Sequence, residues 1–397
     1  MKSIYVDVHA LQTVPPSNLN RDDTGAPKSA VYGGARRARV SSQAWKRATR
    51  EYFGEQKLLD PRDLGVRTRK VVDLLAERIT RREPSIDRAA ALTLAAEVFA
   101  AIIGKKLEPP ARKNKGGEEG QDAVPESKYL MFLGSRQLDN LADLAIEGAA
   151  DPAAFLKDKK NKVRAKELAD TEHSVDIALF GRMVADAADI NVDAAVQVAH
   201  ALSVHPVENE SDYFTAVDDR NMEEESGAGM ISTTDFNSAT LYRYASVNVH
   251  QLAATLGDGQ RDDRPATEPV RRAVEAFIEA FVSSMPTGKI NTFGNHTLPD
   301  AVLVTLRTTR PISYVAAFED PVTAHTGSGH LREAAERLAG YIPDIERAYG
   351  NDATRSWVLR IGLHTGKLTD VATEVPKLSA LVAEAGQAVA DALGQPA

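Results

Sequence analysis

Helical periodicity dominates the residues from about 60 to 200, and strand-like segments lie on both sides of this stretch. On the N-terminal side, residues 3–11 (SIYVDVHAL) carry β-branched side chains at alternate positions, which predicts the first strand. On the C-terminal side, residues 240–249 (TLYRYASVNV) predict the next strand. A sheet interrupted by a long, almost purely helical insertion is an α+β arrangement.

The other elements follow from helix caps and apolar spacing. Ser41 or Ser42 can cap a helix in which Trp45, Ala48 and Tyr52 share the core-facing side. The patterns further predict helices at 66–80, 86–103, 267–284 and 377–393, a strand at 300–307 and a weaker strand at 312–317. Without its insertion, the chain resembles the β-α-β-β-α-β, ferredoxin-like order of RNA-recognition folds.

The composition excludes several classes of protein. The 397 residues include no cysteine, which rules out disulfides, thiolate zinc sites, iron–sulfur clusters and cysteine nucleophiles. No eighteen apolar residues run together, and residues 1–15 lack the apolar run of a signal peptide. We therefore expect a soluble, cytoplasmic protein without a membrane partner.

Positive charge is concentrated in two short stretches of an acidic chain. The net charge is −8, which argues against a free-standing nucleic-acid binder. Between positions 18 and 50, however, eight basic residues stand against two acidic ones, and between 157 and 166 six stand against one. This distribution fits a subunit that binds polyanions only at chosen surfaces.

Catalytic motifs are incomplete. Gly288-Lys289 lacks both the first glycine and the final Ser or Thr of a P-loop. Gly327-Ser328-Gly329 lacks the glycine that begins a nucleophile elbow. We therefore expect no catalytic residues and no enzyme activity.

Candidate metal ligands are equally sparse. The histidine pairs have no acidic third ligand at helical spacing, although each could hold a metal in principle: His200 with His205, and His325 with His330. Two acidic pairs could hold Mg²⁺, namely Asp22-Asp23 and Asp218-Asp219, but loop solvation and arginine pairing are the commoner roles. We expect no metal and no cofactor.

The first basic stretch combines a polar loop, expected over 15–40, with the capped helix. Gly33 and Gly34 have no Cβ, so backbone can approach a ligand closely there, and three arginines follow at 36, 37 and 39. The serines begin a helix whose N-terminal amides suit a phosphate, and Lys46 and Arg50 continue the surface along one helix face. This pattern is typical of sugar–phosphate binding without base reading, and the alternative is a solvated basic face.

Two further segments are open to more than one interpretation. The lysine run 157–166 is either a polyanion surface or a solvated helix face. Residues 205–239 lack helical periodicity, carry a Tyr-Phe pair and a Gly-Ala-Gly turn, and end at a strand. We interpret them as a projecting hairpin because long loops in compact domains are usually functional. The alternative is an ordinary loop with Phe214 in the core.

Five motifs occur in one order along residues 1–306 and together resemble a known family. They are LNRDD (19–23), GGARRARVSSQAWKRATR (33–50), DIALFGRM (176–183), FTAVDD (214–219) and YRY (242–244). They are similar to the CasC-type backbone subunit of the type I-E CRISPR Cascade complex. Ala35 departs from the family pattern, which has a lysine there, and the C-terminal ninety residues match only loosely.

The resemblance implies a hand-shaped α+β protein. The palm, a modified RNA-recognition fold, would comprise 1–58 and 240–397, the helical fingers 59–201 and the hairpin thumb 202–239. Copies would assemble as a filament along the spacer part of a CRISPR guide RNA, together with other Cascade subunits, and order the guide for pairing with target DNA. The family is not catalytic.

The resemblance also assigns residues by motif. Guide phosphates would be held by Arg21, Lys28, Ser41, Gln43, Lys46 and Arg50. Met183 would wedge against a displaced base step, and Phe214 and Thr215 would pack into the kinked duplex. Target DNA would be faced by Lys157, Lys159, Lys160, Lys162 and Lys166. Two other classes remain open: a metal-dependent RNA nuclease on the same palm, with Asp22 and Asp23 as ligands, or a stand-alone single-stranded RNA-binding protein.

Overall fold

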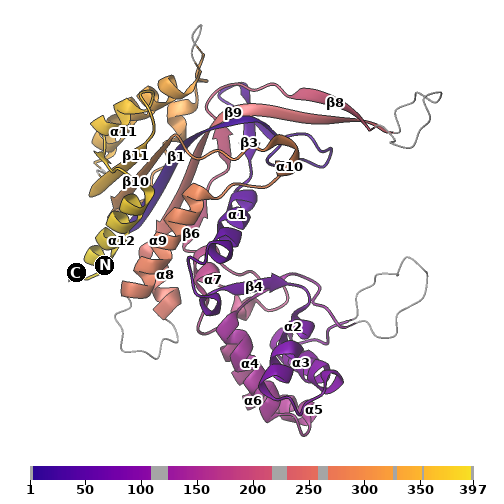
Figure 1. Cartoon of the computed structure of the whole chain (residues 1–397). Coiled ribbons are helices and arrows are strands. Elements are labelled where there is room, and N and C mark those ends of the chain that lie inside the picture. Colours follow the sequence, from indigo (N-terminus) through magenta and orange to yellow (C-terminus); the bar gives the residue numbers. More distant parts are fainter. Residues whose placement is uncertain are drawn as a thin grey trace, which may run out of the picture. The chain divides into compact units, whose positions relative to one another are not determined.

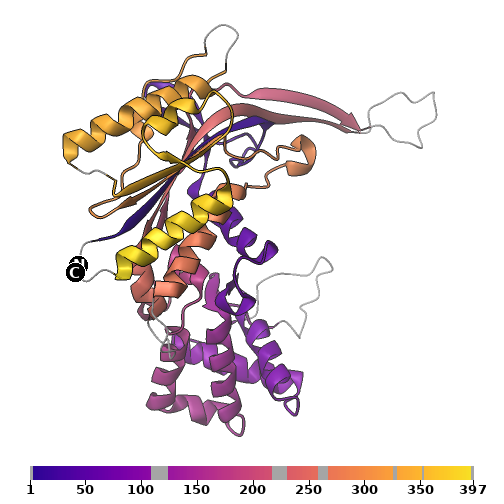
Figure 2. The same cartoon turned by 60° about the vertical axis from the view of Figure 1, so that its left-hand side comes forward.

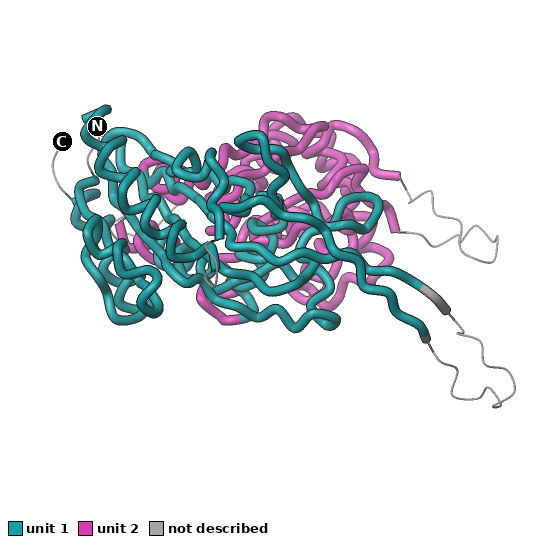
Figure 3. The backbone as a smooth tube through the Cα atoms, turned by 90° about the horizontal axis from the view of Figure 1, so that it is seen from above, with its two compact units in different colours: residues 1–55, 197–249, 274–397 teal, residues 56–196, 250–273 magenta. Residues whose placement is uncertain are grey.

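The computed structural model describes residues 3–108, 124–216, 230–257, 267–324, 329–350 and 353–394. The chain forms two compact units, coloured separately in Figure 3. Unit 1 comprises 1–55, 197–249 and 274–397, and unit 2 comprises 56–196 and 250–273. Unit 2 thus includes a second chain segment, 250–273, beyond the helical insertion. Among the described residues, no helix is long and apolar enough to cross a bilayer.

Unit 1 is built on a ten-stranded sheet with the order β12-β11-β10-β1-β9-β7-β3-β2, and β6 and β8 also pair with β9. The strands are β1 (Tyr5–Ser17), β2 (Ser29–Tyr32), β3 (Ala35–Val40), β6 (Val196–Val198), β7 (Ala201–Ser203), β8 (Glu210–Ala216), β9 (Met230–Asn248), β10 (Ala301–Arg307), β11 (Arg355–Arg360) and β12 (Thr373–Glu374). Pairs along this order are antiparallel except β11 with β12.

Helices cover both faces of this sheet (Figures 1 and 2). They are α1 (Ser42–Glu55), α9 (Thr267–Ser283, of which residues 274–283 belong to unit 1), α10 (Ile290–Phe293), α11 (Leu331–Tyr349) and α12 (Leu378–Gly394). On one face, Leu338 of α11 shares a buried apolar cluster with Tyr242 and Leu303. On the other face, Trp45 of α1 packs among Val14 and Leu241. The alternation of strand side chains supplies both layers from the same strands.

Unit 2 has a separate apolar core, in which Leu75, Phe99 and Leu141 are buried. Its elements are β4 (Gly65–Thr68), α2 (Val71–Arg82), α3 (Arg88–Ile103), β5 (Met131–Gly134), α4 (Ser135–Glu147), α5 (Pro152–Lys157), α6 (Lys159–Ala169), α7 (Val175–Phe180) and, apart from its first residue, α8 (Val249–Gly257). β4 and β5 form an antiparallel two-stranded sheet.

The α+β class, the first strand, the helix after Ser41, the 267–284 and 377–393 helices and the 300–307 strand are confirmed. The insertion is not purely helical, because residues 66–68, expected as the start of a helix, belong to β4. The polar loop expected at 15–40 is also wrong in part, since it contains the β2–β3 hairpin. Gly33 and Gly34 form its two-residue turn with φ of 56° and 73°, where a Cβ is disfavoured.

The strand expected at 312–317 is wrong. Residues 315–318 form a short 3₁₀ helix, η3 (Val315–Phe318). The Ile312 amide donates to the Asp7 carboxylate at 3.0 Å, and the Tyr314 amide donates to the Tyr242 hydroxyl at 2.9 Å. Because these amides bond side chains of the sheet, they are not available to a strand partner.

Candidate nucleic-acid interface

The basic helix α1 is fixed at its start by two side chains. The Ser41 hydroxyl accepts a bond from the Ala44 amide at 3.4 Å, and Asn20 Oδ1 accepts one from the Ser41 amide at 2.9 Å. Trp45, on the inner side of the helix, is buried. On the outer side, spaced three and seven residues apart, lie Gln43, Lys46 and Arg50.

The loop before β2 brings the other cationic side chains to the same helix start. The Asn20 carbonyl accepts from the Lys28 amide at 2.8 Å, so the loop closes beside Ser41. Arg21 is exposed on it. Asn20 therefore connects Arg21 and Lys28 to the first turn of α1.

Asp22, one of the two acidic residues of this loop, has a structural role. Its carboxylate accepts bonds from the Thr24 hydroxyl, the Thr24 amide and the Ala26 amide. The Thr24 hydroxyl bond, with the backbone bonds, lowers the pKa of Asp22. Carboxylates bonded in this way stabilise turns. No cluster of three metal-ligating side chains occurs among the described residues.

Arg39 and His200 add a contact that the sequence motifs do not contain. An Arg39 Nη lies 3.1 Å from His200 Nδ1, and Arg39 Nε donates to the Ser29 carbonyl at 3.2 Å. Burial, Arg39 and Lys28 all lower the pKa of His200. These two cations and the imidazole are therefore gathered at one place, although 161 residues separate Arg39 from His200.

Arg37 does not contribute to this surface, contrary to its interpretation as part of a basic loop. Its side chain is fully buried, and its guanidinium donates to the carbonyls of Tyr32, Ser203, Phe318 and Glu319. It therefore stabilises the β2–β3 hairpin against the rest of unit 1. Arg36, the preceding residue, is exposed.

Three cations of this surface have no carboxylate partner among the described residues. Within the described part of the chain, no carboxylate forms an ion pair with Lys28, Arg39 or Lys46, whereas Arg47 pairs with Glu51 at 2.8 Å. Burial lowers the pKa of Lys46, so holding its charge there is costly without a counter-charge. An external anion would satisfy all three groups.

β8 and β9 form an antiparallel hairpin that extends beyond the sheet (Figure 1). Phe214 pairs with Ser232, and 41% of the Phe214 side chain is exposed. Thr215 is exposed as well. The alternative that Phe214 belongs to the core is therefore wrong. Residues 217–229, with Asp218 and Asp219, lie outside the described residues.

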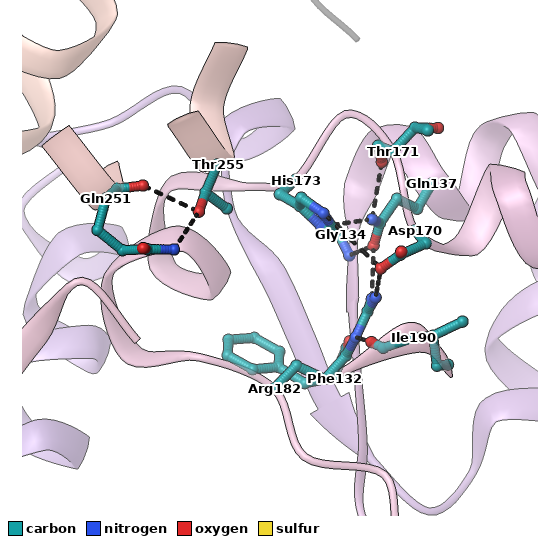
Figure 4. Close-up of polar contacts among 10 residues, drawn as sticks. All are labelled: Phe132, Gly134, Gln137, Asp170, Thr171, His173, Arg182, Ile190, Gln251 and Thr255. Carbon is teal, nitrogen blue, oxygen red and sulfur yellow. Dashed lines mark hydrogen bonds and ion pairs between the residues drawn. The ribbon is translucent and has the colours of Figure 1, made fainter. Parts of the chain in front are cut away.

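Met183 lies in unit 2 and is the most exposed residue of its motif, at 82%. The preceding Arg182 is buried, and it donates to the Asp170 carboxylate at 2.9 Å and to the Ile190 carbonyl at 2.7 Å (Figure 4). Burial lowers the pKa of Arg182 to about 10, against the effect of Asp170. Arg182 thus anchors the loop that presents Met183.

The lysine run in unit 2 is two helices and not one. Asp158 ends α5 and caps α6, because its carboxylate accepts from the Lys160 amide at 2.8 Å. The exposed lysines of the run are Lys157, Lys159, Lys160 and Lys162. Lys166 forms an ion pair with Asp189, so it is less available for an external phosphate.

His200 and His205 do not form the metal pair considered from the sequence, because both have other partners. His205 Nε2 accepts from the Thr240 amide at 3.0 Å, and its Nδ1 donates to the Pro206 carbonyl at 2.8 Å. The His205 ring stacks on His330, with 3.7 Å between centroids. Both nitrogens of His205 are thus occupied, and His325 lies outside the described residues.

Residues 6–384 match the model of a family described as CT1975-like protein. The chain belongs to this family. No match was found among curated proteins. Two solved structures align over nearly the whole chain, which agrees with the resemblance to Cascade expected from the motifs.

The first of these structures carries the description "CRISPR RNA-guided surveillance complex, pre-nicking". It is 34% identical, with a TM-score of 0.81, and the match covers 97% of this chain and 100% of the other. The second is a "CRISPR RNA-guided surveillance complex" chain at 29% identity and a TM-score of 0.72, covering 97% and 99%.

Sequence reasoning missed the role of His200 in this CT1975-like chain. The sequence presents Arg39 only as part of an arginine run, and no local pattern links it to a histidine 161 positions away. The sequence indicates no strand at either position, because Arg39 falls in an expected polar loop and His200 at the end of the expected helical insertion. Their pairing follows from the register of β3 with β7, in which Arg39 faces Leu202.

Proposed function

We propose that this chain is the guide-RNA-binding backbone subunit of a type I-E CRISPR surveillance complex, Cascade. The observation that carries the proposal is the cationic surface around the start of α1, where Lys28, Arg39 and Lys46 have no acidic partner among the described residues. The descriptions of the two similar structures support it. In this assignment other Cascade subunits and further copies of the chain are the protein partners.

The palm is proposed to be a modified RNA-recognition fold. The order β10-β1-β9-β7 is antiparallel throughout, with α1 following β1 and α9 preceding β10. This is the strand order that a β-α-β-β-α-β fold produces. Arg243 of β9 contacts both Trp45 of α1 and Phe281 of α9, which supports both helices lying on one face.

The mechanism we propose is recognition of the guide backbone without reading of bases. Arg21, Lys28, Lys46 and Arg50 neutralise phosphates, while Ser41 and Gln43 supply hydrogen bonds at the helix start. Sequence is then read by pairing between guide and target, as in other RNA-guided complexes.

The exposed side chains of the hairpin and of the Met183 loop would act on base stacking. Phe214 and Thr215 on the hairpin, and Met183 in unit 2, are presented to solvent where a base step could receive them. The lysines at 157, 159, 160 and 162 would face target DNA. No catalytic step is assigned to the chain.

The test is a salt titration of binding to labelled single-stranded RNA. Lys46→Gln with Arg50→Gln should lower the slope of log K against log salt by roughly 0.7 for each phosphate that is no longer neutralised, for every RNA sequence alike. Arg47→Gln, on the same helix but paired with Glu51, is the matched control and should leave the slope unchanged. An unchanged slope in the double variant would contradict the proposal, as would a decrease that depends on RNA sequence.

Two further measurements separate the alternative functions. Cleavage of the RNA on titration with Mg²⁺ would favour a nuclease that uses Asp22 and Asp23. Base preference with a fixed stoichiometry would favour a stand-alone RNA-binding protein. We expect binding without cleavage, and light scattering that shows multimers only when RNA is added.

A further inference from the structure

One face of the β8–β9 hairpin carries the exposed Phe214. Successive side chains of a strand point to opposite faces, so Phe214 shares its face with Ser232, with which it is paired, and with Thr234 and Phe236 of β9. Thr234 is two residues nearer the sheet than Ser232, which corresponds to roughly 7 Å along the strand.

Residues 285–294 lie against this same face. The Phe293 ring of α10 contacts the Phe236 ring, with 5.7 Å between centroids. Lys289 Nζ donates to the Thr234 hydroxyl at 2.8 Å. The segment therefore follows the hairpin outward from Phe236 toward Phe214.

The backbone is strained at Lys289. Lys289 has a φ of 47°, a backbone conformation that residues other than glycine rarely adopt. The residue before it must be glycine, because a Cβ on Gly288 would come within 2.3 Å of the Leu19 carbonyl oxygen. Gly288 thus fixes the segment against the loop that carries Arg21.

The ammonium group of Lys289 is bonded to a neutral hydroxyl and not to a carboxylate. Among the described residues, no carboxylate lies within ion-pair distance of it. Asp212, opposite Thr234 in the hairpin register, makes no ion pair with Lys289. An ammonium on the same hairpin face as an exposed aromatic is suited to a phosphate near an unstacked base.

We propose that Lys289 is a further phosphate ligand of the RNA and that it acts together with Phe214. The offset of roughly 7 Å spans about two nucleotides at a rise of 3.4 Å each, so one strand can meet both side chains. Phe214 enters the base step, and Lys289 holds a phosphate about two nucleotides from the step that is opened. This inference rests on the proposed function and extends it to the hairpin base.

The test compares two variants of the full-length chain that both break the contact between Lys289 and Thr234. Lys289→Met removes the charge and keeps the length of the side chain and its backbone strain, whereas Thr234→Val removes only the hydrogen-bond acceptor. With labelled single-stranded RNA, Lys289→Met should lower the salt slope by roughly 0.7 and weaken binding several-fold at low salt. Thr234→Val should leave the slope unchanged.

A second readout is the fluorescence of 2-aminopurine placed along the RNA. Lys289→Met should reduce the unstacking signal at the same positions as Phe214→Ala, and the double variant should lose less than the sum. If both variants only lower the melting temperature and the slope of Lys289→Met equals that of the parent, Lys289 merely braces the hairpin and the inference is overturned. If the parent chain shows no salt-dependent RNA binding, the proposed function fails, and this inference with it.

Discussion

The guanidinium carbon of Arg243 lies 3.8 Å from the centre of the Trp45 ring system. The same group lies 4.6 Å from the centre of the Phe281 ring, and it donates to Gln12 Oε1 at 2.7 Å. Burial lowers the pKa of Arg243 to about 9. A buried cation near both aromatic rings thus attaches the basic helix α1 to the middle of the sheet.

This arrangement predicts opposite phenotypes for two consecutive residues. Trp45→Ala should lower the free energy of unfolding by about 3–5 kcal/mol, because it leaves a cavity and removes one face of the Arg243 site. Lys46→Gln should leave that free energy nearly unchanged and weaken RNA binding. Urea denaturation and RNA titration of both variants provide the measurements. Equal stability losses would contradict the division of α1 into an anchoring and a binding side.

The hairpin predicts a loss of function without a loss of stability. Because 41% of Phe214 is exposed, Phe214→Ala should change the melting temperature by no more than a few degrees. Capture of target DNA by the assembled complex should fall, and the guide positions at the base step that Phe214 enters should become less reactive to base-specific probes. A markedly earlier melt with unchanged probing would contradict the role of Phe214 as a wedge.

In the Met183 loop, the effect of the backbone conformation at Gly181 can be measured separately from the contact that the Met183 side chain makes. A Cβ at Gly181, where φ is 77°, would lie 2.8 Å from the Val192 carbonyl oxygen. Gly181→Ala should therefore destabilise unit 2, whereas Met183→Ala, at an exposed site, should not. Both should reduce target capture, as measured by electrophoretic mobility shift. A stable Gly181→Ala variant with normal capture would show that the loop conformation is not required.

His205 predicts that stability falls in mild acid. Burial, together with His330 and Arg37, lowers the pKa of His205 to about 4, although the bond to the Pro206 carbonyl opposes this. The unfolded chain takes up this proton near pH 6.5 and the folded chain only near pH 4, so the unfolded state binds more protons in that window. Stability from this group is complete above pH 6.5 and is lost as the pH falls toward 4.

The full effect amounts to about 3 kcal/mol, at 1.36 kcal/mol per pKa unit. His205→Gln keeps an acceptor for the Thr240 amide and cannot titrate. Between pH 7 and pH 4.5, thermal melts should therefore show a smaller decrease for His205→Gln than for the parent chain. The comparison isolates His205 from His9, whose pKa burial also lowers. Parallel curves would exclude the role assigned to His205.

The sequence patterns predicted features that depend only on residues close together in the chain. The start of α1 could be predicted because Ser41 and Trp45 lie within one turn of each other and need no distant partner to be recognised. The exposed hairpin could be predicted for a similar reason, since residues 205–239 lack any helical alternative. The two-part lysine run was missed although its signal, Asp158 before Lys159, is also local.

Side chains with distant partners could not be predicted in this way. Arg37 resembles a surface cation in the sequence, yet Ser203 and Phe318, whose carbonyls bind it, lie 166 and 281 positions away. The amide of Ile312 takes a partner 305 positions distant, which removes a strand that periodicity alone predicts. Lys289 belongs to an incomplete P-loop motif in the sequence, and its placement beside Thr234 depends on the path of β9.

Strand β9 extends without interruption through nineteen residues, from Met230 to Asn248. Its outer part pairs with β8, while its inner part, from Asn237, pairs with β1 in the middle of the sheet. The hairpin is thus held rigidly at one end, because its second strand continues into the middle of the sheet. Seven residue pairs at about 3.4 Å each give it a reach of roughly 20 Å. In a row of identical subunits, the length of the hairpin would set how far one subunit reaches toward the next. Adding two residues to each strand would extend that reach by roughly 7 Å and keep each side chain on its own face.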